Sequence, residues 1–149
     1  MYPRQHVILG AIFSLMLYFL FHVNLVNSLI VFLSSVLIDV DHYLFYAIKK
    51  RDFSYAGAYS WHVEQEIKAK RMARKGIRKR GPFHIFHTIE FHLLLLLLSF
   101  RNTILFYAFA GFVFHSAVDF VDLALTKTIY RREYFFTSWL IRRFINNAS

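Results

Sequence analysis

Four long apolar blocks divide this sequence, and they limit its possible folds more than any other feature. They cover residues 5–23, 25–48, 83–100 and 103–125. A helix needs about 20 mainly apolar residues to cross a bilayer, and each block comes close to that length. The first block leads directly into the second and lacks the small-residue cleavage site of a secretory signal. We therefore expect an all-α, polytopic membrane protein: a four-transmembrane-helix bundle forming a single membrane domain over residues 1–149.

Composition supports this class and excludes several others. Hydrophobic residues make up 57% of the chain, whereas soluble domains contain about half. The sequence has no cysteine, which excludes a disulfide scaffold, thiolate metal sites and a cysteine nucleophile. With only 5 Gly and 2 Pro, a collagen-like or low-complexity chain is excluded as well.

Basic residues are strongly biased to one side of the predicted bundle. If the spans alternate in direction, Arg101 is the only one of the 18 Lys and Arg residues that falls opposite the two termini. The positive-inside rule then places both termini and the loop 49–81 in the cytoplasm, with the bundle in the inner or plasma membrane. Because topology accounts for the net charge of +9, we expect no nucleic-acid partner.

Two cytosolic segments are predicted to form interfacial helices. In the basic loop 49–81, Ser60 can cap a helix that continues to Lys75 and stops at Gly76. The amphipathic tail 128–146 mixes aromatic residues with arginine. Both segments have the composition of helices that lie on an anionic leaflet, so membrane lipid is the expected partner.

Ionisable residues inside the apolar blocks are the strongest indication of function, because each carboxylate there costs at least ~2.5 kcal/mol on insertion scales. Five of the nine acidic residues occupy these blocks: Asp39, Asp41, Glu90, Asp119 and Asp122. Six histidines share the blocks or their edges: His6, His42, His84, His87, His92 and His115. At about 1.5 Å per residue, most of these groups fall within roughly 15 Å of the cytosolic surface. The four helices are thus expected to bring them into one layer.

Spacing within this layer suits metal ligation. His115 and Asp119 are four residues apart, and the pairs Asp39/His42 and His84/His87 are three apart, so each pair shares a helix face. Asp41 would point elsewhere on a regular helix. Imidazole and carboxylate without sulfur suit zinc, iron or manganese. We expect two or three divalent ions held by His6, Asp39, Asp41, His42, His84, His87, His115 and Asp119.

The same residues carry a resemblance to a known family. An early His6, Asp39-Val-Asp41-His42, Arg80-Gly81-Pro82-Phe83-His84 and His115-x-x-x-Asp119 occur in that order along nearly the whole chain. This set resembles the membrane-bound metal-dependent hydrolases, a family also described as LexA-binding, inner-membrane-associated hydrolases. Its motifs are similar to those of the zinc-dependent phospholipase C and P1 nuclease superfamily: D-x-D-H, H-R-G-x-T-H-S and H-x-x-x-D. Here Lys79, Phe83 and Ile85 replace the first His, the Thr and the Ser of the second motif, and His87 is the candidate for the missing ligand.

The resemblance implies metal-dependent hydrolysis, most plausibly of a phosphoester, with zinc as the expected ion. Asp39 or Asp41 is then the candidate to orient and deprotonate the attacking water. Lys79 and Arg80, one turn before His84, are candidates to bind the substrate phosphate. The depth of the site suggests a lipid or lipid-linked phosphate reached from the cytosolic leaflet.

Several alternatives remain open from the sequence. His22, His62 and His92 are interpreted as structural, Glu90 either binds metal or pairs with a histidine, and Asp122 lies beside the ligands or at the interface. A metal-ion or ion transporter is the first rival function, although the outer halves of the spans lack a polar pathway. A haem-binding electron carrier is the second, although it would not need clustered aspartates.

Overall fold

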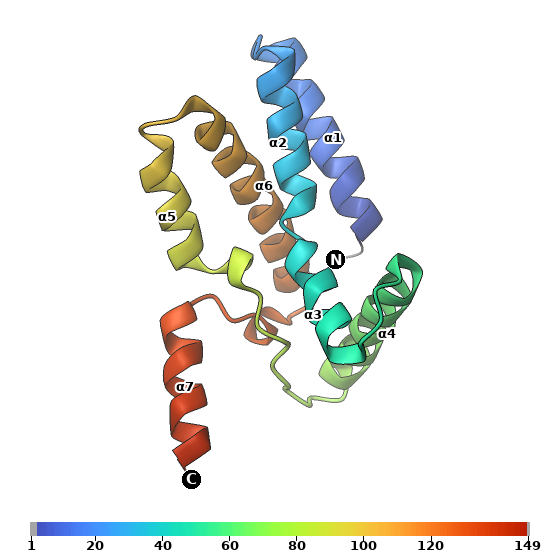
Figure 1. Ribbon diagram of the computed structural model, residues 1–149. Coiled ribbons are helices and arrows are strands. Elements are labelled where there is room, and N and C mark those ends of the chain that lie inside the picture. Colours follow the sequence, from blue (N-terminus) through green and yellow to red (C-terminus); the bar gives the residue numbers. More distant parts are fainter. Residues whose placement is uncertain (1–2, 149) are drawn as a thin grey trace.

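The computed structural model describes residues 3–148, with side chains up to residue 145, and over that range the chain is helical with no β-strand. Within residues 3–148, seven α-helices and two 3-10 turns follow one another (Figure 1). They are α1 (Pro3–Leu20), α2 (Leu25–Leu37), α3 (Val40–Lys50), α4 (Tyr55–Arg74), η1 (Ile85–His87), α5 (Ile89–Ser99), α6 (Thr103–Leu125), η2 (Ile129–Arg131) and α7 (Phe136–Ala148). The expected all-α class is confirmed.

Three stretches of helix are long and apolar enough to cross a membrane: α1, the nearly continuous pair α2–α3 (Leu25–Lys50), and α6. The helix predicted over residues 103–125 is found with the same bounds. The block 83–100 differs, because its only α-helix is Ile89–Ser99, with 11 residues. At about 1.5 Å per residue this helix is about 16 Å long, roughly half the thickness of a hydrocarbon core.

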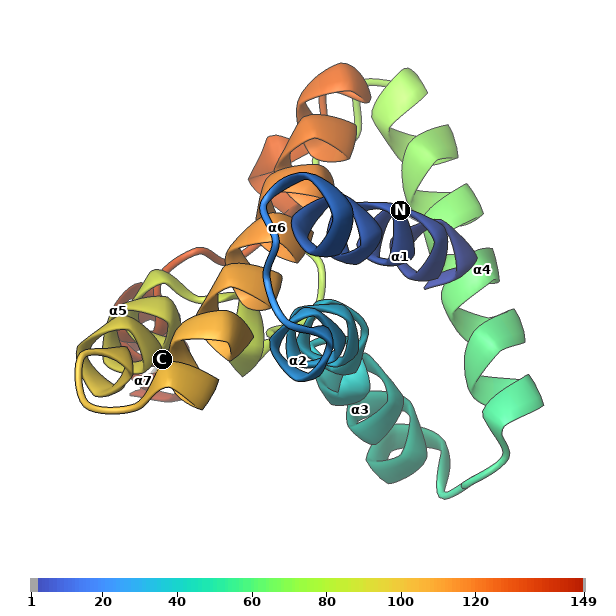
Figure 2. The same ribbon diagram turned by 90° about the horizontal axis from the view of Figure 1, so that it is seen from above.

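Helix α2 packs against both α1 and α6, which also contact each other, and α5 packs on another side of α6 (Figures 1 and 2). Two glycines permit the close approach to α2. A Cβ atom on Gly111 of α6 would lie 2.5 Å from the carbonyl oxygen of Val31, and one on Gly10 of α1 would overlap the hydroxyl of Ser35. The three helices therefore form a tight core from which α3, α4 and α7 extend at one end.

The second apolar block is not one regular helix. It breaks at Ile38–Asp39, where α2 ends and α3 begins. In a regular helix residues two positions apart face different directions, which is why Asp41 was expected to point away from Asp39. The break removes this restriction, and both carboxylates face the same region of the molecule, as the distances below show.

The segment before α5 is irregular, which corrects the expectation that His84 and His87 occupy the first turns of a helix. His84 has an extended backbone (φ −133°, ψ 110°), His87 ends a 3-10 turn, and α5 starts only after the N-cap Thr88. Backbone amides of this segment that have no partner within a helix donate to groups elsewhere in the protein. Phe86 N donates to the Asp41 carboxylate (3.2 Å) and Gly81 N to the Arg131 carbonyl (2.8 Å). Non-helical backbone of this kind is stable where its polar groups find protein partners.

The two segments expected to be cytosolic are helical, as predicted, but with different bounds. The cap of α4 is Ser54, whose hydroxyl accepts from Gly57 N, so the prediction of a start at Ser60 was wrong. Gly76 follows the end of α4 with φ +76°, as a stop signal should. The tail divides into η2 and the amphipathic α7.

Candidate metal centre

Three helices and two irregular segments contribute to one cluster of imidazoles and carboxylates. His6 comes from α1, Asp39 from the break, Asp41 and His42 from α3, His84 and His87 from the segment before α5, and His115 and Asp119 from α6. Their nitrogen and oxygen atoms form four overlapping groups, each within 4.8 Å, that could hold a metal ion. These groups contain all eight of the side chains expected from the sequence.

On the α6 side of the cluster, Asp39 lies between several histidines. Its Oδ1 is 3.4 Å from His115 Nε2, 3.5 Å from His42 Nε2 and 3.6 Å from His87 Nε2. Asp119 also faces three imidazoles: its Oδ1 lies 3.1 Å from His6 Nε2, and its Oδ2 lies 3.5 Å from His115 Nε2 and 3.8 Å from His87 Nε2. Asp39 is thus the carboxylate that links the ligand groups to one another.

On the α3 side, Asp41 is the central carboxylate. Its Oδ1 lies 3.4 Å from His84 Nδ1 and its Oδ2 lies 3.4 Å from His87 Nδ1. The rings of His42 and His84 stack with 3.6 Å between their centroids. His87 therefore faces both Asp41 and Asp39 and connects the two sides of the cluster.

The unpaired polar atoms of the cluster fit a bound cation. Among the described residues, the buried atoms without a hydrogen-bond partner include Asp41 Oδ1, His42 Nε2, both ring nitrogens of His84, and His87 Nδ1. Buried polar groups are normally paired, and each unpaired one is costly. Two ligands bound tetrahedrally at about 2.0–2.1 Å lie about 3.3–3.4 Å apart, and the separations above fall close to this value. The residues present therefore fit divalent metal ions.

The backbone orients His115 for such a role. Its Nδ1 lies 2.7 Å from the carbonyl oxygen of Ser35. A carbonyl can only accept, so Nδ1 carries a proton, and in the neutral imidazole Nε2 presents its lone pair to the cluster. Metal-binding histidines usually donate their second nitrogen in this way, and His115 is only 1% exposed.

The structure adds Arg132, which no sequence motif indicated. Its Nη2 lies 2.6 Å from Asp119 Oδ2. Residues 126–135, here termed the strap, follow α6. Arg131 in this strap pairs with Glu66 of α4 at 2.9 Å. The only available signal was the pair Arg131-Arg132 in the basic tail, whose composition indicated an interfacial segment instead.

The ion pair between the strap and α4 affects the ionisation of Glu66. Burial opposes ionisation, but the nearby charges of Arg131 and Lys70 outweigh it and hold the pKa of Glu66 below its ordinary value. Glu66 is therefore a carboxylate at neutral pH and joins α4 to the strap electrostatically.

A cavity of about 970 Å³ opens beside the cluster. It is lined by His6, Asp39, His42, His84 and Asp119 and by a group of basic side chains that includes Arg4, Lys49, Lys68, Lys79, Arg80, Arg131 and Arg132. Both residues predicted to bind substrate phosphate thus line the cavity. Arg80 Nη1 also pairs with Glu133 at 2.8 Å, so its guanidinium is partly engaged by the strap.

Other ionisable residues have protein partners. Glu90 accepts from Phe136 N (2.9 Å) and Thr137 N (3.1 Å) at the start of α7, so it caps a helix and does not pair with a histidine. His92 Nδ1 lies 2.9 Å from the Thr88 carbonyl and its Nε2 lies 3.0 Å from Ser116 Oγ. Both nitrogens of His92 are therefore satisfied, as expected for a packing residue.

His62 of α4 lies closer to the cluster than its position in a loop suggested. Its Nε2 is 2.9 Å from the carbonyl oxygen of His42, and its ring packs edge-on against the His42 ring at 5.3 Å. Burial lowers the pKa of His62 below its ordinary value, although the His42 carbonyl opposes this shift. A neutral His62 can donate to that carbonyl and support His42.

Comparison of this chain with models of protein families, with curated proteins and with solved structures found no match.

Proposed function

We propose that this protein is a membrane-embedded, metal-dependent hydrolase that cleaves a phosphoester of a lipid or lipid-linked substrate at the cytosolic leaflet. The observation that carries the proposal is the cluster of buried, unpaired imidazole and carboxylate atoms at ligand spacing. The motif resemblance to membrane-bound metal-dependent hydrolases supports the reaction type, and two or three zinc ions are the expected cofactors.

The membrane placement rests on helix length and charge. Three helices have the length and apolarity to span a bilayer, and we take α5 with the segment before it as a fourth, shorter passage. The basic loop and tail lie at the same end of the bundle as the cluster (Figure 1). The positive-inside rule then makes this end cytosolic, in the inner or plasma membrane, with both termini in the cytoplasm.

The reaction adds water across a phosphorus–oxygen bond. Bound divalent ions supply the Lewis acidity that lowers the pKa of water and offsets phosphoryl charge. Asp39 or Asp41 accepts the proton of the attacking water, whose oxygen bonds to phosphorus. The ester oxygen leaves with its electron pair and takes up a proton to give an alcohol.

The basic residues of the large cavity bind the phosphoryl group before and during this step. Arg132 is the best placed, because its guanidinium already lies against a carboxylate of the cluster. Guanidinium groups hold phosphate oxygens through paired hydrogen bonds. Lys79 adds a positive charge at the cavity wall, which complements the charge that develops on the phosphoryl oxygens.

Elemental analysis and a hydrolysis assay on the purified protein test the proposal together. We expect at least two equivalents of a divalent metal, hydrolysis of alkyl phosphates, loss of activity with a chelator, and recovery on adding zinc. Full activity in a metal-free preparation would overturn the proposal. Metal flux in liposomes without hydrolysis would assign the cluster to transport, and a Soret band would assign the histidines to haem.

A further inference from the structure

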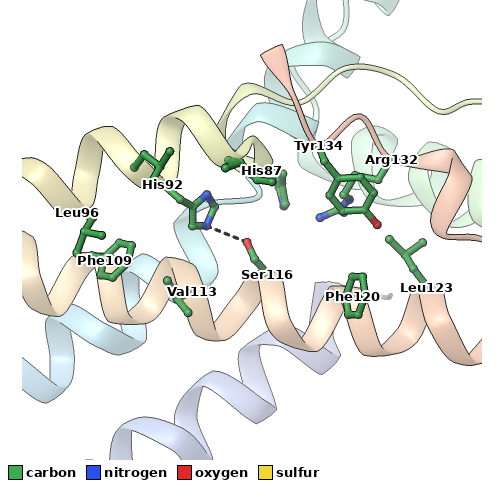
Figure 3. A pocket seen from close by; sticks show the side chains of 12 residues that line it. His87, His92, Leu96, Phe109, Val113, Ser116, Phe120, Leu123, Arg132 and Tyr134 are labelled. Atoms are coloured by element: carbon green, nitrogen blue, oxygen red, sulfur yellow. Dashed lines mark hydrogen bonds between the residues drawn. The ribbon is translucent and has the colours of Figure 1, made fainter. Parts of the chain in front are cut away.

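A second, apolar cavity of about 300 Å³ lies between α5 and α6 and ends beside the metal cluster (Figure 3). Its wall includes Leu93 and Leu96 of α5 and Phe109, Val113 and Phe120 of α6. The polar side chains along this wall are His92 and Ser116, which hydrogen-bond to each other at 3.0 Å. The body of the pocket therefore presents a hydrocarbon surface.

One end of the pocket is polar and cationic. His87, Arg132 and Tyr134 line it, and His87 belongs to the candidate metal cluster. The Tyr134 hydroxyl is buried and has no hydrogen-bond partner within the part of the chain that the structure describes. An anionic oxygen at this end would meet a guanidinium and a free phenol donor, and both favour binding.

The other side of the pocket opens on the surface of the α5–α6 pair. Ile89, Leu93, Val113 and Phe120 line the pocket and are exposed. In the proposed membrane placement, this surface faces lipid. A hydrocarbon chain could therefore enter sideways from the bilayer and reach the cluster without crossing water.

Arg132 and Leu123 line both cavities, so the cluster region has an apolar space on one side and a wider, basic space on the other. A pocket of about 300 Å³ lies at the lower end of the usual range of volumes for ligand sites. This volume suits one hydrocarbon chain better than several. The two cavities thus match the two parts of an amphiphile that has a phosphate at its polar end.

We propose that the α5–α6 pocket binds a single hydrocarbon chain of an anionic lipid phosphate, with the phosphate held by Arg132 and Tyr134 beside the cluster. The inference rests on the proposed function and names its substrate class. The chain occupies the apolar pocket, and any further headgroup occupies the large basic cavity.

Photo-crosslinking tests the binding directly and without hydrolysis. Hexadecyl phosphate with a diazirine in its chain is added to the purified full-length protein in neutral detergent, and the labelled residues are identified by mass spectrometry. We expect labels concentrated on Leu93, Leu96 and Phe109, and we expect excess unlabelled hexadecyl phosphate to remove them. The matching hexadecanol probe, which lacks the anionic group, should label these residues at least fivefold less.

Two matched substitutions localise the effect on α6. V113W fills the pocket, whereas V121W places the same side chain on an exposed position of the same helix that does not line it. We expect V113W to reduce pocket labelling at least tenfold and V121W to leave it unchanged. Equal reduction by both variants, labelling no stronger than on exposed faces of α1, or crosslinks to a second copy of the chain would overturn the inference.

A chain-length series separates this inference from the proposed function. Wild-type protein should favour hexadecyl over butyl phosphate in kcat/KM, and V113W should lower this ratio at least tenfold. Hydrolysis of both esters with an unchanged ratio in V113W would overturn the pocket assignment and leave the hydrolase intact. Competed crosslinking of the pocket in a protein that binds no metal and hydrolyses neither ester would support the pocket assignment and overturn the hydrolase proposal.

Discussion

Helix α6 and the segment before α5 each supply two side chains to the cluster, but by different means. Helix α6 is regular over 23 residues, so His115 and Asp119 share a face because they are four residues apart. The segment before α5 supplies His84 and His87 from an extended residue and a 3-10 turn. A regular helix presents donors along one face only, whereas irregular backbone can surround the site from another direction.

The two regions also satisfy their backbone groups differently. The amides of α6 are bound within the helix, and its N-cap Asn102 accepts from Ile104 N at 2.8 Å. The irregular segment depends on the rest of the molecule, through the Asp41 carboxylate and the carbonyls of the strap. We therefore expect α6 to position its ligands independently and the irregular segment to position its ligands only when its anchors are intact.

The largest expected effect comes from removing a candidate ligand on α6. H115A takes away an imidazole whose Nε2 lies within 3.5 Å of both Asp39 and Asp119. We expect metal affinity to fall by more than about 100-fold, since loss of a supporting residue alone costs 10–100-fold. Elemental analysis after dialysis against a weak chelator measures the loss.

H92A is the matched control for this prediction. His92 lies on α5 and has protein partners at both ring nitrogens. The variant should retain wild-type metal content, although it loses packing. If H92A lost as much metal as H115A, the assignment of these two histidines to different roles would be wrong.

The next prediction tests whether α6 must lie close to α2. A Cβ at residue 111 would meet backbone atoms of α2, the Val31 carbonyl at 2.5 Å and Ser35 N at 3.0 Å. G111A should therefore lower the free energy of unfolding by about 1–3 kcal/mol, as overpacking does, and weaken the bond from His115 Nδ1 to Ser35. Thermal unfolding in detergent measures the first effect and metal titration the second.

G10A provides the comparison on α1. The Cβ at this position would meet only side-chain atoms, of Ser35 and Phe32, which can rotate away. We expect G10A to lower the free energy of unfolding by less than G111A does, with little change in metal affinity. An equal loss in both variants would show that backbone contact is not what limits the approach of α6.

This contrast also explains what the sequence could predict. The all-α class, helix 103–125 and the convergence of eight donors follow from apolar length, charge bias and i, i+4 spacing. The sequence did not indicate the break at Ile38–Asp39 or the unwinding before α5, because both depend on long-range partners such as Asp41 to Phe86 N. Arg132 was missed for the same reason, since no local pattern relates it to Asp119 thirteen residues earlier.

Smaller effects should come from the cap that ends the irregular segment. Thr88 is 1% exposed, and its hydroxyl donates to the Ile85 carbonyl at 2.8 Å and accepts from Phe91 N at 3.3 Å. T88V keeps the shape but loses both bonds, so we expect a loss of about 1 kcal/mol in unfolding free energy and roughly 10-fold weaker metal binding as His87 shifts.

N102A removes the cap of α6 at the opposite end of the bundle. It should lower the free energy of unfolding by a similar amount, about 1 kcal/mol, and leave metal affinity unchanged. Comparing T88V with N102A thus separates an effect on stability from an effect on ligand positioning. Weaker metal binding in N102A would contradict the view that α6 positions its ligands independently of its distant end.

The smallest effect concerns the strap, which anchors the irregular segment through Arg131. E66Q removes the charge that pairs with Arg131 at 2.9 Å. Because the pKa of Glu66 is held below its ordinary value of 4.5, the pair stabilises the fold above that pH and loses this contribution as the pH falls. At pH 7 we expect E66Q to be less stable by up to about 1 kcal/mol, as for a partly exposed ion pair.

The difference in unfolding free energy between wild type and E66Q should shrink below pH 4.5, because Glu66 then becomes protonated. Comparing the two chains at each pH cancels the titration of the cluster histidines, which both chains share. E64Q, on the same helix, is the matched control and should show no such difference. If the difference in unfolding free energy between wild type and E66Q stayed constant from pH 7 to pH 4, the charge of Glu66 would not be what holds the strap to α4.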